Sequence, residues 1–175
     1  RCSHPSNMSA LSLGLYMPPT NEHGQKSLVY VVGGTLPQRQ EIAQNLKSFY
    51  TFELFDSESR VIAKLSSTSP TAIIIDEILP PKGGASLIAK LRKMISTKSI
   101  PIVLTAHIEH AEIIAEATSY ENVYLVERPF SRSTFIAALS SGINAGTEAK
   151  WEDIEPTQKA ALKNTLNSFN SFADL

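Results

Sequence analysis

Cysteine is almost absent from this chain. The 175 residues contain one, Cys2, so no disulfide can form within the chain. A zinc site built from several cysteines is excluded for the same reason. Strong charge of one sign is also absent, because 16 Lys and Arg residues stand against 17 Asp and Glu residues and the formal net charge is −1. No overall field draws the chain onto nucleic acid or anionic lipid, and we expect neither as a direct partner.

Long hydrophobic runs are missing as well. No apolar stretch approaches the roughly 18 to 20 residues that a membrane-spanning helix needs. The stretch from Leu11 to Pro19 is short, is interrupted by Gly14, and lacks the charged start of a secretory signal. Hydrophobic residues at 42% and aromatic residues at 7% are ordinary for a globular domain. We therefore expect a cytoplasmic protein with no membrane partner.

Short apolar runs alternate with helical patterns from residue 27 onward. The runs lie at 28–32, 52–55, 72–75, 100–104 and 123–126. Each is followed by apolar residues three or four apart, and the clearest such stripe is Leu87, Ile88, Leu91, Met94 and Ile95. Because the runs are mostly continuous rather than alternating with polar residues, they predict a parallel sheet covered on both faces. The predicted fold class is α/β, a doubly wound five-stranded parallel sheet.

Two flanking segments have a different character. Residues 1–26 are rich in Ser, Pro, Asn and Gly, and we expect a flexible N-terminal arm there. The domain itself is expected at 27–146. Residues 147–175 are predicted to form a charged linker and then an extra C-terminal helix from Pro156. The apolar stripe of that helix favours either a connector toward an effector module beyond Leu175 or an amphipathic helix that docks on the domain.

Candidate functional residues stand where the predicted strands end. In a doubly wound sheet the carboxyl ends of the strands converge on one crevice. The residues found at these ends are Gly33, Gly34, Asp56, Asp76, Glu77, Thr105 and Arg128. The site is therefore expected at this edge of the sheet.

Three motifs at these ends stand in register with one another. The segment 73–84 is an apolar strand ending in Asp76, followed at fixed offsets by Pro80 and Gly84. Thr105 closes the fourth predicted strand 29 residues after Asp76, and an Arg-Pro-Phe sequence begins at Arg128, 23 residues after Thr105. Over about 27–144 this pattern resembles response-regulator receiver domains of two-component systems, which carry Lys-Pro-Phe at the third motif.

The resemblance implies a (βα)5 flavodoxin-like fold and a role in signal transduction rather than enzymatic catalysis. Asp76 stands at the phosphoacceptor position, and Thr105 and Arg128 stand at the switch and phosphate-contact positions. Ile78 and His107 correspond to positions at the mouth of the site. A carboxylate there acts as nucleophile, while cations neutralise the oxygens of the transferring phosphoryl group.

The chain departs from the family at the end of the first strand. Receivers place two Mg²⁺-binding acids there, and this sequence has Gly33 and Gly34. Mg²⁺ needs carboxylates and water in a demanding octahedron, so Asp76 alone is a poor site. Glu77 should turn away from Asp76 because consecutive strand residues face opposite sides, and Asp56 should lie at the side of the crevice. We expect no Mg²⁺ and slow or absent phosphotransfer.

Two further departures concern the fifth strand. Arg128 replaces the family's Lys, and its planar fork favours an ion pair with Asp76. The family's aromatic switch residue falls on Leu125, with Tyr124 one position earlier. A bulge or loop insertion could bring Tyr124 into that role.

Other chemistries have weaker support. The sequence from Gly33 to Thr35 matches neither common phosphate-binding glycine motif, which favours a plain tight turn over a nucleotide or flavin site. His107 and His110 lie three apart without an evident third ligand, so we expect surface residues rather than metal ligands. Ser86 and Thr105 have no evident His and Asp partners, and a hydrolase triad is unsupported.

The sequence thus predicts a pseudo-receiver that acts through protein contacts. The expected contact surfaces are 108–144 and the terminal helix, with an effector module of the same chain or a second copy as partner. A histidine kinase partner is left open. The alternative is a conventional receiver that a histidine kinase phosphorylates on Asp76.

Overall fold

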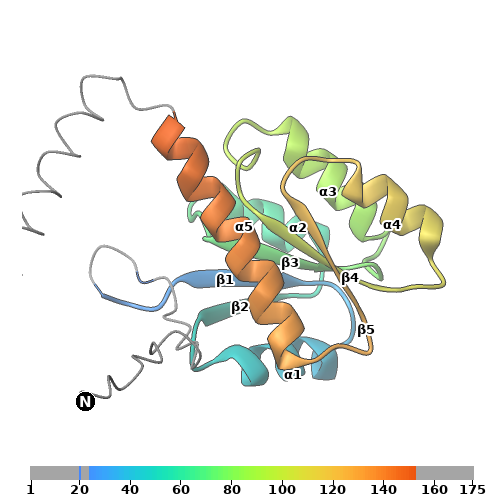
Figure 1. Ribbon diagram of the computed structural model, residues 1–175. Helices are drawn as coiled ribbons and strands as arrows, with labels where there is room; N and C mark the ends of the chain where they lie inside the picture. The colour runs from blue at the N-terminus through green and yellow to red at the C-terminus, as the bar shows by residue number, and fades with distance from the viewer. Residues whose placement is uncertain (1–19, 21–23, 153–175) are drawn as a thin grey trace, which may run out of the picture.

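Five parallel strands form one sheet at the centre of the domain (Figure 1). The computed structural model describes residue 20 and residues 24–152, with side chains described as far as residue 145. The sheet order is β2-β1-β3-β4-β5, so β2 lies on one side of β1 and the three later strands lie on the other. The strands are β1 Leu28–Val32, β2 Thr51–Phe55, β3 Ala72–Asp76, β4 Ile102–His107 and β5 Val123–Arg128.

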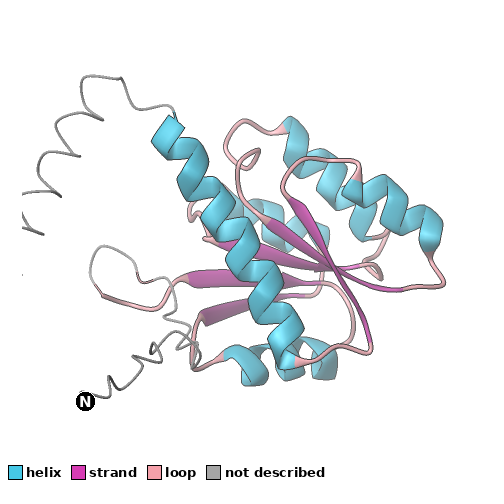
Figure 2. Cartoon of the chain, in the orientation of Figure 1, coloured by secondary structure: helices cyan, strands magenta, loops and turns pink. Residues whose placement is uncertain are grey.

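Helices cover both faces of this sheet (Figure 2). They are α1 Leu36–Leu46, α2 Glu58–Leu65, α3 Gly84–Lys93, α4 Ala111–Thr118 and α5 Arg132–Glu152. Side chains of α2, α3 and α4 share one hydrophobic cluster with the sheet, and those of α1 and α5 share the other. The predicted α/β class and five-stranded parallel sheet are confirmed. Among the described residues, no helix is both long and apolar enough to cross a membrane.

Local chemistry explains where the elements beside the crevice begin. Helix α1 starts from a capping box, in which the Gln38 N–H donates to Thr35 Oγ1 at 3.4 Å and Gln38 Oε1 accepts from the Thr35 N–H at 2.8 Å. Strand β3 is buried at every position, as its continuous apolar sequence predicts for a central strand. Both elements therefore hold the crevice residues on rigid supports.

Two predicted boundaries differ in the structure. Helix α3 ends at Lys93, and Met94 has an extended backbone, so Ile95 leaves the apolar stripe and is 95% exposed. The prediction that Ile95 belongs to the buried face was wrong because periodicity continued past the helix end. Helix α5 runs to Glu152, so the predicted linker is helical over its first residues. Its remainder, the predicted terminal helix, and most of the predicted arm lie outside the described residues.

Gly84 is where α3 meets the end of β3. A Cβ at this position would lie 2.3 Å from the Asp76 carbonyl oxygen. We expect Gly84→Ala to lower the free energy of unfolding by about 1–3 kcal/mol, because the helix must move away from the strand. Urea denaturation measures this effect. Ser86→Ala, two residues along the same helix, is the control and should change stability by no more than about 0.5 kcal/mol; equal losses in both variants would contradict the packing argument.

Candidate functional site

The carboxylate of Asp76 is held by donors from two neighbouring segments. Asp76 ends β3 and stands in register with Thr105 of β4. The Thr105 hydroxyl donates to Asp76 Oδ2 at 2.8 Å, and the Ile78 N–H donates to Oδ1 at 2.9 Å. Both carboxylate oxygens therefore already accept hydrogen bonds from the protein.

Arg128 completes this cluster from the end of β5. Its guanidinium donates to Asp76 Oδ2 and lies 3.5 Å from Thr105 Oγ1. The two charged side chains are only 10% and 6% exposed for Arg128 and Asp76, respectively. The guanidinium carbon also lies 5.3 Å from the centre of the Phe130 ring, close enough for a cation–π contact. The predicted ion pair is confirmed, and three of the sequence-predicted positions are in contact.

Gly33 and Gly34 press directly against this carboxylate. Their φ angles are +86° and +64°, which glycine adopts without strain. A Cβ at Gly33 would lie 2.9 Å from the Ile78 carbonyl oxygen, and a Cβ at Gly34 would lie 3.3 Å from Asp76 Cγ. Their N–H groups donate to the carbonyl oxygens of Phe55 and Ile78, at 3.1 and 2.8 Å. The segment is thus a tight turn whose amides are engaged, as the sequence favoured.

Arg39 is a second cation at this turn, and the sequence analysis missed it. The side chain is 7% exposed, and Nη1 donates to the carbonyl oxygens of Gly33 at 3.1 Å and Gly34 at 2.6 Å. A signal was available, because Arg39 precedes the buried Ile42 and Leu46 at helical spacing and so shares the inward face of α1. A buried guanidinium requires such acceptors, and the turn supplies two for Nη1, whereas Nε has no partner in the described part of the chain.

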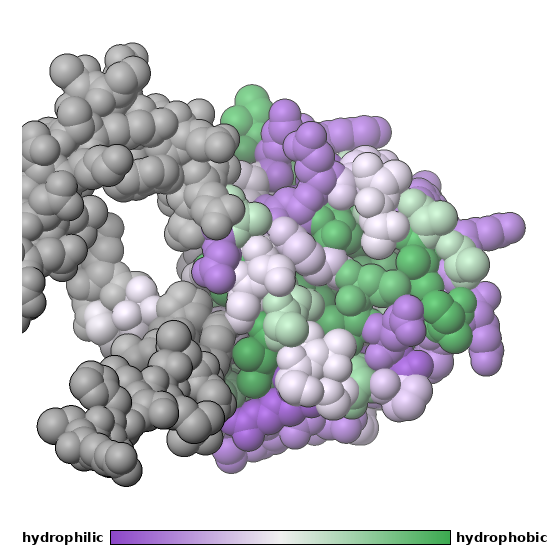
Figure 3. Space-filling model, in the orientation of Figure 1, coloured by the Kyte–Doolittle hydropathy of each residue, from purple (hydrophilic) through white to green (hydrophobic). Residues whose placement is uncertain are grey.

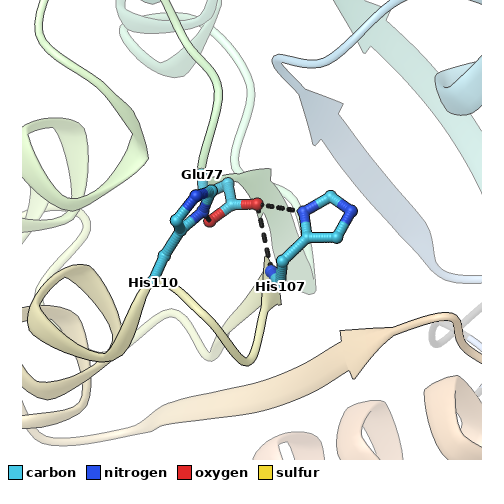
Figure 4. Close-up of side chains that lie close together, drawn as sticks. All are labelled: Glu77, His107 and His110. Atoms are coloured by element: carbon cyan, nitrogen blue, oxygen red, sulfur yellow. Dashed lines mark hydrogen bonds and ion pairs between the residues drawn. The ribbon is translucent and has the colours of Figure 1, made fainter.

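Glu77 leaves the same strand end on the other side, as its alternation with Asp76 predicts. Its N–H donates to the Thr105 carbonyl oxygen, and its carboxylate turns to the β4–α4 loop (Figure 4). There Glu77 Oε1 lies 2.6 Å from His107 Nδ1 and accepts the His107 N–H at 3.0 Å, while Oε2 lies 2.5 Å from His110 Nδ1. Asp76 and Glu77 therefore belong to two separate polar clusters.

Burial and hydrogen bonding act in opposite directions on Glu77. The residue is 3% exposed, and burial alone raises the pKa of its carboxyl group. The hydrogen bonds from His107 and His110, together with the positive charge of His110, outweigh that effect and leave the pKa of Glu77 below its ordinary value. This buried carboxylate is therefore held in its charged form.

The two histidines lie at the surface, as expected, but the sequence did not reveal their contacts with Glu77. Each side chain is 46% exposed, but both rings point one nitrogen at a buried acid. A signal was available in the sequence. Glu77 was expected to face away from Asp76, and two histidines follow the next strand in the sheet, where they could meet it. His107 consequently does not turn toward Asp76, whereas Ile78 lies beside it with an exposed side chain.

The remaining sequence-predicted positions lie apart from the cluster. Asp56 is exposed at the end of β2 and pairs with Arg60 at 3.2 Å. Tyr124 packs on the α5 face of the sheet, whereas Leu125 packs on the α4 face. The pairing of β4 with β5 is continuous from Val123 to Arg128, so no bulge in this strand moves Tyr124 into the aromatic switch position.

The comparisons with known proteins find this fold in receiver domains. No protein-family model and no curated protein matches the sequence. The receiver domain of a sensor histidine kinase from Pseudomonas aeruginosa is 18% identical, with a TM-score of 0.62, and the alignment covers 68% of this chain and 98% of that one. A signal receiver domain of an HD domain-containing protein from Pseudomonas fluorescens is also 18% identical, with a TM-score of 0.64 over 71% and 99% of the two chains.

A longer protein shares the same architecture. NtrX from Brucella abortus is 16% identical, with a TM-score of 0.67, and the alignment covers 75% of this chain and 30% of NtrX. These similarities confirm the predicted flavodoxin-like fold of receiver domains.

The buried ion pair should matter more for stability than an exposed one. We expect Arg128→Ala to lower the free energy of unfolding by about 3–5 kcal/mol, because it leaves the Asp76 carboxylate buried without its cation. Urea denaturation monitored by circular dichroism measures the loss. The control is Arg60→Ala, which breaks the exposed Asp56 pair and should cost at most about 1 kcal/mol. A loss at Arg128 no larger than that at Arg60 would show that the Asp76 charge does not depend on its partner.

Proposed function

We propose that this chain is a receiver-like signalling module that does not use phosphorylation of Asp76 and acts through protein contacts. The observation that carries the proposal is the state of the Asp76 carboxylate. Its oxygens accept hydrogen bonds from Thr105, Ile78 and Arg128, and its side chain is 6% exposed. A nucleophile needs a free lone pair and an approach path for the donor, and this carboxylate is restricted in both.

The donor set around Asp76 also does not fit Mg²⁺. The receiver domain from Pseudomonas aeruginosa was solved with a magnesium ion coordinated in its active-site cleft. In this chain Gly33 and Gly34 offer no carboxylate, and Arg39 places a permanent positive charge on the carbonyl oxygens of that turn. The neighbouring acid Glu77 is turned to the two histidines. These contacts disfavour a divalent cation beside Asp76.

Losing the metal weakens the chemistry as a whole. Phosphoryl transfer to a carboxylate is catalysed almost entirely by positioning and by neutralising charge on the transferring group. Arg128 would have to give up its pair with Asp76 in order to serve an incoming phosphoryl group, and no metal would share that work. We therefore infer a signalling role that is independent of this reaction.

A conventional phosphoacceptor is the second candidate, and one observation favours it. Asp76, Thr105 and Arg128 are in mutual contact at the positions that the resemblance assigns to phosphate acceptance and response. If the Arg128 side chain swung away, the carboxylate would become accessible beside a hydroxyl donor. The two candidates therefore differ in whether the ion pair opens.

The proposed contact surface consists of α4, β5 and α5. Strand β5 is at the edge of the sheet, and its first three side chains are half-buried rather than covered. Figure 3 shows apolar surface on this side of the molecule, around the β5 edge between α4 and α5. NtrX carries the same fold as a minor part of a longer chain, which supports an effector module of the same polypeptide as one partner. A second copy of this chain is the other.

Phosphorylation chemistry tests the proposal directly. The full chain is incubated with acetyl phosphate, or with the phosphoryl mimic beryllofluoride, with and without Mg²⁺. We expect no mass increase on Asp76 and no change in the thermal unfolding midpoint, because no metal assists transfer to the paired carboxylate. Asp76→Asn is the matched control and should likewise gain no mass and show no shift of its own midpoint on treatment. Mg²⁺-dependent modification that disappears in Asp76→Asn would establish the conventional alternative.

Light scattering after size exclusion tests the contact surface. We expect the full chain to form a concentration-dependent dimer, and a variant without residues 151–175 to retain it, because the edge strand β5 remains. Val123→Lys places a charge on this edge and should give a monomer. Ser59→Lys lies on α2, the helix that follows the opposite edge strand β2, and should leave the dimer intact. A dimer that disappears on truncation would move the interface to the terminal segment.

A further inference from the structure

Glu77, His107 and His110 bring three metal-binding side chains into one small volume (Figure 4). One ligand atom from each residue can be chosen so that all three lie within 4.8 Å of one another. We propose that these residues form a site for a divalent transition metal of the zinc class, with one coordination position open to water or to a partner's side chain. This site is separate from the Asp76 cluster and does not depend on the function proposed above.

The donor types select the class of metal. Imidazole nitrogen suits Zn²⁺, Cu²⁺ and Ni²⁺, whereas Mg²⁺ and Ca²⁺ prefer sites made of oxygen. Two histidines and one glutamate are a ligand set of zinc sites that keep their fourth position open. The side chains of His107 and His110 are 46% exposed, so that fourth position faces solvent.

The distances require little adjustment. The carboxylate oxygens of Glu77 lie 2.6 and 2.5 Å from the Nδ1 atoms of His107 and His110, as hydrogen bonds. With metal bonds near 2.1 Å, ligand atoms in a tetrahedral site are about 3.4 Å apart. The contacts of Glu77 with the two rings must therefore lengthen by less than about 1 Å, and the widest pair of ligand atoms, within 4.8 Å of each other, must close by up to about 1.4 Å. The proton on each coordinating Nδ1 must leave, because neutral imidazole binds through its lone pair.

The backbone positions the ligands in advance. Glu77 is fixed by its N–H bond to the Thr105 carbonyl oxygen and by the Gly84 N–H, which donates to its own carbonyl oxygen at 3.0 Å. The His110 N–H donates to the His107 carbonyl oxygen at 2.9 Å, and this turn sets the spacing of the two rings. Bound metal would tie the end of β3 to the loop before α4, a helix of the proposed contact surface.

The electrostatics also favour a cation here. The Glu77 carboxylate is 3% exposed and charged, and a buried charge is costly unless it is paired or coordinates a metal. In the described structure the two histidines are its side-chain partners. A divalent ion would replace shared protons with a stronger and more localised positive charge.

Calorimetric titration of the full, chelator-treated chain with Zn²⁺ tests the site. Co²⁺ is the spectroscopic probe, because its visible spectrum reports nitrogen and oxygen coordination. We expect one ion per chain, no competition from equimolar Mg²⁺, and a Co²⁺ spectrum of low coordination number. Glu77→Gln and His110→Ala should each weaken binding by at least about tenfold. Replacing a residue that only hydrogen-bonds to a metal ligand already costs about tenfold or more, and these two residues are the ligands themselves.

Matched variants separate this site from other ligands. Glu109→Gln changes an exposed acid in the same turn and should leave affinity unchanged. Cys2, His4 and His23 lie outside the described residues, so the triple variant Cys2→Ser, His4→Ala, His23→Ala must retain binding. Because His110 is exposed, its variant should keep the circular dichroism spectrum even if Glu77→Gln unfolds. The proposal is overturned by absence of saturable binding, by unchanged affinity in His110→Ala, or by loss of binding in the triple variant.

Discussion

The buried pair between Asp76 and Arg128 is the interaction on which the carboxyl edge of the sheet depends. It joins the central strand β3 to the edge strand β5 across β4, where the Thr105 hydroxyl contributes the third member. Removing both charges from water is expensive, and the Thr105 hydroxyl and the Ile78 N–H offset part of this cost by donating to the same carboxylate. The geometry is strongly specified, since either charge alone would be buried without compensation.

The glycines at the end of β1 are part of the same constraint. The turn approaches Asp76 so closely that a Cβ at Gly33 would contact the Ile78 carbonyl oxygen at 2.9 Å, and both glycines have positive φ. Replacing them with acids would thus require a different path for the backbone as well as a different charge. Arg39 reinforces this path by donating to both carbonyl oxygens. The two glycines therefore have two effects: they offer no carboxylate to a metal, and they let the backbone pass close to Asp76.

The sequence predicted most of the fold because each buried strand is a continuous apolar run and each helix has its own stripe. It also predicted the Asp76 and Arg128 pair, because matched motif spacings placed both residues at strand ends on the same edge of the sheet, on either side of β4. It failed at Ile95, where helical periodicity outlasted the helix, and at Arg39, whose acceptors are backbone atoms that no sequence pattern displays. It also failed to connect His107 and His110 with Glu77, since that contact depends on how the loop after β4 folds back.

Asp76 and Glu77 are adjacent at the end of β3, but their side chains point to opposite sides and have different partners. Asp76 is paired with the guanidinium of Arg128, a cation that is part of the chain itself. Glu77 is hydrogen-bonded to two imidazoles, whose nitrogens are also metal ligands. The signalling role that we propose needs one element whose state can change. By this reasoning the changeable element lies on the Glu77 side of the strand, next to α4, while the Asp76 side serves as fixed structure.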